Sequence, residues 1–231
     1  MTVATVTPRK GRSLADNDQT LVIGLGRFGR ALAATLGDLG KEVMGVDASA
    51  QIVQECAPTM THVVRADSTD AEALRQLGAA DFGTAVVAIG SDVQASILTT
   101  YALVDLGIPR IWAKAITAQH GAILERVGAH RVVFPERDMG IRVAHTMLGR
   151  TVDYIELDED FVLVETTVPR EIVGKTLKDA ALRRRHDVTV VCVKTPGGRF
   201  EYATPETVVG EGDLIVVAAA IDKAQAFAAL D

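Results

Sequence analysis

Aromatic residues are scarce in this chain of 231 residues, at 4% of the total, and positive charge is in deficit, with a formal net charge of -6 at pH 7. Hydrophobic cores built with so few aromatics must consist of Val, Ile, Leu and Ala. The acidic balance argues against sequence-independent nucleic-acid binding, which needs clustered Lys and Arg. We therefore expect an aliphatic core and no nucleic acid among the partners.

Long apolar runs and paired cysteines are missing as well. The longest apolar run, Leu214–Ile221, has only the length of a strand, whereas a bilayer span needs about 20 apolar residues. The polar first 20 residues contain no apolar signal-peptide core. Cys56 and Cys192 lie far apart without metal-like spacing, so two buried thiols in a reducing cytoplasm are expected. Contact with a membrane would then run through a partner.

Regular periodicity begins at residue 20. Strand-length apolar runs alternate with helical patterns, which predicts a Rossmann-like parallel sheet with helices on both faces. The predicted strands are Leu21–Ile23, Glu42–Val46, His62–Arg65, Thr84–Ile89, Arg110–Lys114 and Arg131–Phe134. The predicted helices are Arg27–Leu39, Ala50–Cys56, Asp70–Leu77, Asp92–Leu106, Ala118–Val127 and Arg137–Arg150. We therefore expect a flexible tail over residues 1–19 and an α/β domain over residues 20–150, which ends in a crossover helix.

The pattern changes after residue 150 and predicts a small α+β module over residues 151–231. Thr176 and Asp179 resemble a capping box that opens a helix running to about His186. A glycine turn at residues 195–198 predicts a hairpin, and a helix closes the chain. The predicted strands of this module are Thr151–Leu157, Phe161–Val168, Val188–Lys194, Arg199–Ala203 and Leu214–Ala219.

A glycine-rich motif lies between the first predicted strand and the first predicted helix, which is the context that a dinucleotide-binding fingerprint requires. Gly24 permits a tight turn, Gly26 lets backbone amides approach a diphosphate, and Gly29 lets the helix pack closely on the strand. The free amides and the positive helix end would bind the anion. The alternative is a glycine turn without a ligand. The residues of the predicted binding loop are Gly24, Gly26, Arg27, Phe28 and Gly29.

Asp47 ends the second predicted strand, 23 residues after Gly24, where a carboxylate can accept hydrogen bonds from ribose hydroxyls. A 2'-phosphate would meet a like charge there, so NADP is disfavoured. Arg27 is an unusual addition, because a guanidinium in the loop can reach a terminal phosphate and so favours ADP or ATP besides NAD. Its alternative is a solvated arginine on the first helical turn.

Three more residues lie at the ends of predicted strands, on the same edge of the sheet. Asp67 is a candidate for contact with the adenine, or else the N-cap of the next helix, for which Ser68 and Thr69 compete. Gly90 lies where ligands bind in such folds. Lys114 is either a phosphate ligand or a solvated surface lysine.

Groups for catalysis are not evident. The five histidines show no metal-ligand spacing, and no nucleophile motif occurs. An NAD-dependent oxidoreductase would need a substrate domain larger than the C-terminal module. An NAD-sensing transcription regulator would need a helix-turn-helix element with a basic face, which is not apparent. The sequence therefore favours a nucleotide-binding sensor over both alternatives.

Several segments together resemble the RCK (KTN) family, the regulatory proteins of potassium uptake systems of the Ktr/Trk type. The resemblance covers residues 20–231, with an N-terminal RCK-N (TrkA-N) and a C-terminal RCK-C (TrkA-C) domain. The segment Phe134–Gly140 is the most specific, because the general Rossmann fingerprint does not include it. The other segments are Thr20–Gly29, Glu42–Asp47, Ala88–Gly90, Gln94–Thr100 and Ile111–Ala115.

The resemblance implies a cytoplasmic regulatory subunit, peripheral to the inner membrane, that gates a membrane potassium channel. It implies dimers that assemble into an octameric ring, with ATP, ADP or NAD(H) at the glycine loop. Arg27 would contact the γ-phosphate at the dimer interface. Glu136 would help to hold a cation such as Mg²⁺, Ca²⁺ or Na⁺ near the phosphates, or else it is a charge favoured by the helix N-terminus.

The resemblance also implies a second ligand, because the C-terminal domain of relatives can bind cyclic di-AMP between protomers. Arg183 aligns best with the ligand-binding arginine, although three consecutive arginines at residues 183–185 blur the match. The alternative is a solvated basic helix end. The helix at 137–150 carries an apolar stripe that either contacts a partner subunit or packs within its own chain; the stripe consists of Met139, Ile141, Val143, Ala144, Met147 and Leu148.

Overall fold

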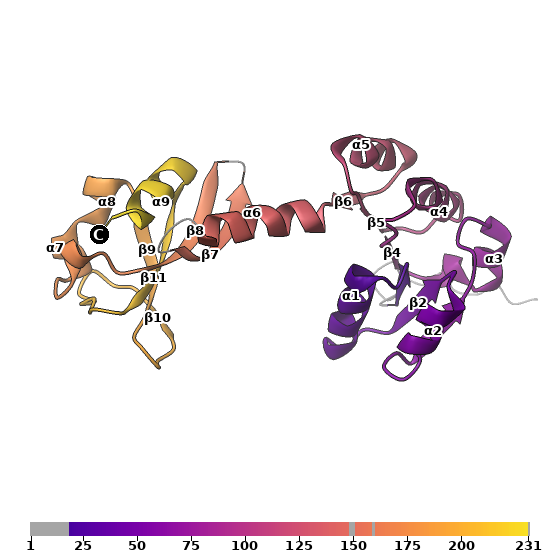
Figure 1. The fold of residues 1–231 in the computed structure, drawn as a ribbon, viewed down its shortest axis with the longest axis horizontal. Coiled ribbons are helices and arrows are strands. Elements are labelled where there is room, and N and C mark those ends of the chain that lie inside the picture. The colour runs from indigo at the N-terminus through magenta and orange to yellow at the C-terminus, as the bar shows by residue number, and fades with distance from the viewer. Residues whose placement is uncertain (1–18, 148–150, 159, 231) are drawn as a thin grey trace, which may run out of the picture. The chain divides into compact units, whose positions relative to one another are not determined.

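A computed structural model describes residues 19–147, 151–158 and 160–230. The predicted tail, apart from residue 19, and the end of the helix predicted to reach Arg150 lie outside these residues. The described residues divide into two compact units, one that ends at Glu136 and one that begins at Arg137; Figure 1 labels elements of both. Each unit has its own sheet and is described by itself.

The first unit contains a six-stranded parallel sheet in the order β3-β2-β1-β4-β5-β6. Its strands are β1 (Thr20–Ile23), β2 (Val43–Asp47), β3 (His62–Arg65), β4 (Thr84–Val87), β5 (Ile111–Lys114) and β6 (Arg131–Val133). Its helices are α1 (Arg27–Asp38), α2 (Ala50–Cys56), α3 (Ala71–Gln76), the 3₁₀ turn η1 (Ala79–Asp81), α4 (Val93–Asp105) and α5 (Ala118–Val127). The order reverses between β1 and β4, and in open α/β sheets ligands bind at such a point, beyond the carboxyl ends of the strands.

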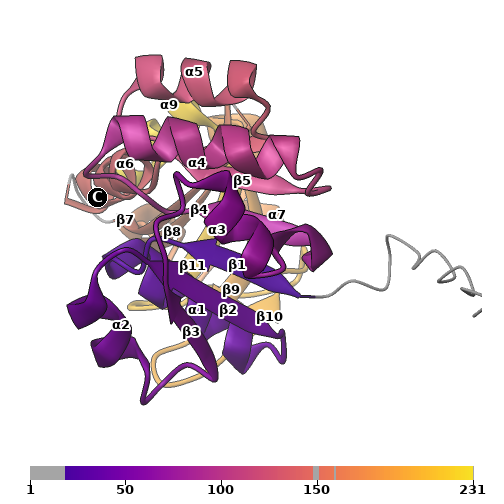
Figure 2. The same ribbon diagram turned by 90° about the vertical axis from the view of Figure 1, so that its right-hand side faces the viewer.

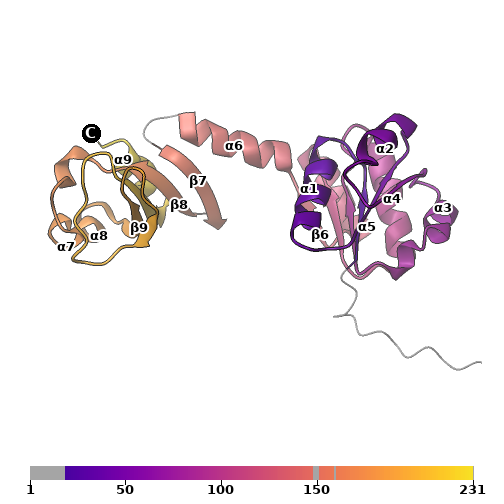
Figure 3. The ribbon, with the colours of Figure 1, turned by 90° about the horizontal axis from the view of Figure 1, so that it is seen from below.

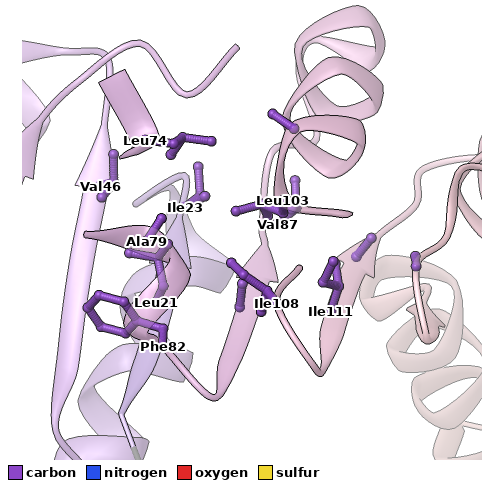
Figure 4. Packing of buried hydrophobic residues seen from close by; sticks show 14 of the residues in the cluster. Leu21, Ile23, Val46, Leu74, Ala79, Phe82, Val87, Leu103, Ile108 and Ile111 are labelled. Carbon is purple, nitrogen blue, oxygen red and sulfur yellow. The ribbon is translucent and has the colours of Figure 1, made fainter. Parts of the chain in front are cut away.

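Both faces of this sheet are covered, because alternate residues of a strand point to opposite sides. Leu21 and Ile23 of β1 join the larger core under α3, α4 and α5, whereas Val22 joins a smaller core under α1 and α2. Figure 4 shows the larger core, in which Phe82 lies beside Leu21 and Ala79 and the other labelled side chains are aliphatic. Helices α4 and α5 contact each other along one layer (Figure 2). The predicted Rossmann-like sheet and its aliphatic core are confirmed.

The second unit is built on a five-stranded antiparallel sheet in the order β10-β9-β11-β8-β7. Helix α9 packs on β8 and β11, and Figure 3 shows it beside this sheet. The strands are β7 (Thr151–Asp158), β8 (Phe161–Thr167), β9 (Thr189–Lys194), β10 (Phe200–Tyr202) and β11 (Leu214–Ala220). The helices are α6 (Pro135–Met147), which begins at the end of the first unit, η2 (Arg170–Ile172), α7 (Leu177–Ala180), α8 (Leu182–His186) and α9 (Ile221–Ala228). The small α+β module predicted after the Rossmann-like domain is confirmed.

The helix predicted from Thr176 to His186 is two helices. The capping box at its start is present, since the Thr176 hydroxyl accepts from the Asp179 amide at 3.1 Å and donates to its carboxylate at 2.8 Å. Ala181 then adopts a left-handed conformation with φ of 52°, which no α-helix can continue through. Apolar periodicity does not reveal this break, because Ala180 and Leu182 on either side of it are both buried.

The division between the units falls in the first turn of α6, after Glu136, whereas the sequence suggested a boundary near residue 150. The two boundaries differ in the unit to which they assign most of α6. Arg142 forms two hydrogen bonds to the Asp153 carboxylate, at 2.7 and 2.6 Å, and the His145 ring stacks on Tyr154 at 3.9 Å. These contacts tie α6 to β7, so most of the helix groups with the C-terminal sheet.

Candidate functional site

The carboxyl ends of the parallel strands bring most of the predicted binding residues to one edge of the first unit. The glycine loop follows β1, Asp47 ends β2 and Asp67 follows β3. Gly90 follows β4, and Lys114 ends β5. We refer to the loop 24–29 together with Asp47, Asp67, Gly90, Lys114 and Glu136 as the carboxyl-edge site.

The glycine loop is a close-packed turn. Gly24 has a φ of 91°, a left-handed value that favours glycine, and its amide donates to the Val46 carbonyl at 2.8 Å. A Cβ atom at Gly29 would lie 1.9 Å from the Gly24 carbonyl oxygen and 3.3 Å from the Ala88 Cβ atom. The first and third glycines therefore provide the turn and the close helix–strand approach that the motif predicted. Gly26 is exposed and is the N-cap of α1, where no side chain caps the helix.

Asp47 holds the loop as well as facing the site. Its Oδ2 atom accepts from the Leu25 amide at 2.8 Å, and its Oδ1 atom accepts from the Ser49 amide at 2.8 Å. A carboxylate has about four lone-pair positions, so both oxygens keep capacity for ribose hydroxyls. The sequence predicted the ribose contact but not this bond across the loop.

Lys114 is buried, which excludes its interpretation as a solvated surface lysine. The residue is 8% exposed, and its ammonium donates to the Glu136 carboxylate at 2.5 Å. It lies 5.8 Å from the centre of the Phe28 ring and fills the space that a side chain at Gly90 would take, since a Cβ atom there would be 3.1 Å from Nζ. A buried cation thus lies at the carboxyl edge of the sheet.

Glu136, on the first turn of α6, is the counter-ion of Lys114. The hydrogen bond from Lys114 lowers the pKa of this carboxyl group, and the positive charge of Arg27 contributes in the same direction. Arg27 itself is exposed on the first turn of α1. Arg27, Lys114 and Glu136 come from three different elements, and the charges of both cations favour the ionised form of the Glu136 carboxyl group.

Asp67 is not the N-cap of α3, because that position is taken by Asp70, whose side chain accepts from the Glu72 amide. Asp67 instead accepts at one oxygen from the amide and the hydroxyl of Thr69, at 3.0 and 2.7 Å, and these bonds lower its pKa. Its carboxylate therefore stays charged at the edge of the site.

A cation site built from protein ligands alone is not present in the part of the chain that the structure describes, which contains no cluster of three His, Cys, Asp or Glu side chains. Glu136 is paired with Lys114. A cation at Glu136 would therefore need oxygen ligands from a phosphate group, and Lys114 would have to turn away.

The three consecutive arginines have different partners. Arg183 donates to the Thr189 hydroxyl at 3.2 and 3.0 Å, whereas Arg185 pairs with Glu171 at 2.8 Å. Arg183 and Arg184 line a cavity of about 440 Å³, together with Lys178. The other lining residues are Leu177, Ala181, Leu182, Val188, Thr189, Val190, Ala203, Thr204 and Pro205. The arginines at residues 183–185 thus lie in the last turn of α8, and two of them also border this cavity.

Sequence reasoning missed Arg30. Its Nε atom donates to the Leu25 carbonyl at 2.7 Å, and its Nη2 atom donates to Glu55 at 2.7 Å. The only signal was its place three residues after Arg27 on the same helix. Nothing local in the sequence indicates that Glu55, on the next helix, would be its partner.

The strand order, the glycine turn and the acidic residue after the second strand define a Rossmann-like domain of the nucleotide-binding type, followed by a small antiparallel module. A model of the TrkA-N domain matches residues 20–135, and a model of the TrkA-C domain matches residues 161–230. The chain belongs to the TrkA-N/TrkA-C family, which includes the Ktr system potassium uptake proteins, and the resemblance stated from the sequence is confirmed.

Relatives of nearly the same length support this assignment. The chain is 37% identical to Ktr system potassium uptake protein A of Bacillus subtilis (strain 168), over 87% of this chain and 91% of the relative. It is 40% identical to Ktr system potassium uptake protein C of the same organism, over 87% and 92%.

Solved structures share the fold at lower identity. The GsuK RCK domain superposes with a TM-score of 0.67 at 21% identity, over 97% of this chain and 48% of that chain. The GsuK channel bound to NAD gives a TM-score of 0.65 at 21% identity, over 96% and 40%. This chain therefore spans about half or less of the GsuK chains that it matches. Among the described residues, no helix combines the length and apolar character needed to cross a membrane.

Proposed function

We propose that this protein is a regulatory subunit that senses a nucleotide and controls potassium uptake through a separate membrane subunit. The observation that carries the proposal is the carboxyl-edge site, where a left-handed glycine turn, an uncapped helix N-terminus and a buried lysine lie at one edge of the sheet. The potassium role is supported by two relatives that are named potassium uptake proteins. This chain matches 91% and 92% of their lengths.

The ligand class is an adenine nucleotide with a diphosphate, either ATP/ADP or NAD(H). Structural relatives described as bound to NAD and to ADP support this class. The amide of Gly26 and the start of α1 would bind the diphosphate, and Asp47 would accept from the ribose. Asp67 is proposed to lie near the adenine, and Gly90 would leave room for the ligand.

Arg27 and Lys114 would distinguish the number of phosphates. Arg27 is exposed and free to turn toward a terminal phosphate, where a guanidinium can bind bidentately. A ligand shifts a conformational equilibrium only by binding its two states differently, and ATP differs from ADP by the one phosphate that these two cations can contact.

A cation would accompany a bound triphosphate. We propose that Lys114 turns from Glu136 toward the phosphates, which releases the carboxylate to share Mg²⁺, Ca²⁺ or Na⁺ with phosphate oxygens. Hard cations of this kind prefer oxygen ligands. The 63% exposure of the Glu136 side chain leaves one face open for this exchange.

Regulation without catalysis fits this site better than an NAD-dependent oxidoreductase does. The described site contains cations and carboxylates that suit phosphate and ribose. A dehydrogenase would in addition need an acid or base beside the nicotinamide. Turnover of NADH with a small substrate would favour the enzyme instead.

A homo-oligomer docked on a membrane potassium channel is the proposed working form, with dimers assembled into an octameric ring on the cytoplasmic side of the inner membrane. No described residue of α6 is buried, and we propose that its apolar stripe contacts a partner subunit rather than its own chain. Four of the described stripe residues are at least 40% exposed: Met139, Ile141, Val143 and Met147. Trp112 of β5, 36% exposed, adds apolar surface to the first unit.

The cavity beside Arg183 is a candidate for a second ligand. Its three basic side chains suit an anion, and cyclic di-AMP is the ligand that we propose for it. We propose that a second copy of the same unit completes the site, as the resemblance to relatives that bind cyclic di-AMP between protomers implies.

The potassium role is tested by deleting the coding gene in its host and measuring potassium uptake. We expect uptake to fall and to be restored by the wild-type chain. The Asp47→Ala chain, which loses both the loop contact and the ribose acceptor, is expected not to restore it at equal expression. Uptake unchanged by the deletion would contradict the proposal.

A further inference from the structure

Arg30 joins the glycine loop to the neighbouring helix. Its guanidinium donates from Nε to the Leu25 carbonyl and from Nη2 to the Glu55 carboxylate, each at 2.7 Å. Glu55 is held in turn by Gln51, which donates to its other oxygen at 3.0 Å. The resulting chain of hydrogen bonds runs from α2 across α1 to the second residue of the loop.

The backbone amide and the carbonyl of Leu25 both form hydrogen bonds to side chains. Its amide donates to Asp47 at 2.8 Å, and its carbonyl accepts from Arg30. The Leu25 side chain is fully buried. Consequently the two peptide planes that flank Leu25 are each held by a side chain from a different part of the chain.

The second of these planes contains the Gly26 amide. In a trans peptide the C=O and N–H groups lie in one plane and point in opposite directions. The Arg30 bond that draws the Leu25 carbonyl toward α1 and α2 therefore turns the Gly26 N–H to the opposite side. Within the described residues this N–H has no hydrogen-bond partner, and Gly26 itself is exposed with open space around its Cα.

We infer that Arg30 is a positioning residue, which orients the Gly26 amide toward the diphosphate of the nucleotide. This inference rests on the proposed function. Arg30 does not touch the ligand; it keeps the loop in its binding conformation before the ligand arrives, so that less ordering free energy is lost on binding. A loop without this bond can rotate the Leu25–Gly26 plane, because glycine restricts that rotation little.

The guanidinium is needed for its shape as well as its charge. Nε and Nη2 lie on one rigid plane and donate in fixed directions, so one group contacts the loop carbonyl and the helix carboxylate together. A lysine presents a single ammonium on a flexible chain. Arg30→Lys is therefore expected to keep the ion pair with Glu55 while loosening the loop carbonyl.

The test compares ADP with AMP by calorimetry on the full chain. Arg30→Ala is expected to weaken ADP binding roughly tenfold and AMP binding much less, since AMP has no diphosphate. Arg30→Lys is expected to weaken ADP binding by a smaller factor, and again to affect AMP binding less than ADP binding. The matched control is Arg75→Ala, which removes an exposed arginine paired with Glu72 on α3 and is expected to change neither affinity.

Amide hydrogen exchange of the ligand-free chain gives a second readout. Residues 24–29 are expected to exchange faster in Arg30→Ala and Arg30→Lys than in wild type, with the exchange of the sheet unchanged. Equal losses for ADP and AMP, or unchanged ADP affinity with unchanged exchange, would overturn the inference alone. A wild-type chain that binds neither nucleotide would overturn the proposed function and the inference together.

Discussion

Replacement of Gly29 by alanine should separate nucleotide binding from folding, because the same helix offers a matched control. A Cβ atom at Gly29 would lie 1.9 Å from the Gly24 carbonyl oxygen, whereas real Cβ contacts stay above about 3.0 Å. The oxygen must therefore retreat by about 1.1 Å, the difference between these two distances. A Cβ atom at Gly37, also on α1, meets nothing within 4 Å.

The two substitutions have different energetic consequences. Alanine gains about 1 kcal/mol over glycine inside a helix, so Gly37→Ala should raise the melting temperature by about 3 °C. At Gly29 the same gain is opposed by an overpacking cost of about 1–3 kcal/mol, so the net change in stability is small or unfavourable. The retreat of the Gly24 carbonyl displaces the binding loop, and a misplacement of about 1 Å can cost on the order of 100-fold.

The assay is a titration of ADP into each variant, alongside a thermal melt without nucleotide. We expect Gly29→Ala to bind ADP at least about tenfold more weakly than wild type, and Gly37→Ala to bind like wild type. Each titration is carried out below the melting temperature of the variant, so that weaker binding reflects a change in the loop and not unfolding. Wild-type affinity in a folded Gly29→Ala chain would refute the assignment of the loop as the phosphate site.

Substitutions of Arg27, Asp153 and Arg183 test three other parts of the molecule. Arg27→Ala should reduce the discrimination between ATP and ADP more than it reduces ADP affinity, and equal losses in calorimetry would remove Arg27 from the terminal phosphate. Asp153 has its pKa lowered chiefly by the Arg142 hydrogen bond, so its contribution to stability is present at neutral pH and is lost as the pH falls through the lowered value. Melting temperatures measured from pH 7 to pH 3 should therefore fall on the acid side, and less steeply in Asp153→Asn. Arg183→Ala should abolish binding of cyclic di-AMP to the full chain without changing ADP binding, whereas retained binding would move the second ligand away from the cavity.

Much of the fold was predictable because its signals are local. Strand-length Val and Ile runs that alternate with helical patterns indicate a covered parallel sheet, and the glycine spacing located the turn after β1. The break at Ala181 was not predictable, since its left-handed conformation interrupts a run in which Ala, Leu, Lys and Arg, all good helix formers, predominate.

The candidate site was predictable residue by residue but not contact by contact. Asp47 and Lys114 could be placed on one edge from the positions of their strands alone. The pairing of Lys114 with Glu136, however, joins residues 22 positions apart on different elements. The same is true of Arg30 and Glu55, 25 positions apart, so only the folded chain reveals how the loop is held and how the buried lysine is compensated.

The loop 24–29 is proposed to bind a nucleotide through the diphosphate of that nucleotide. The most direct measurement is mass spectrometry of the small molecules that co-purify with the full chain, followed by calorimetric titration with ATP, ADP, NAD, NADH and NADPH. We expect an adenine nucleotide with a diphosphate to co-purify or to bind saturably, one per chain, with NADPH weakest because its 2'-phosphate meets Asp47. No co-purified nucleotide and no saturable binding of any of the five would contradict the account.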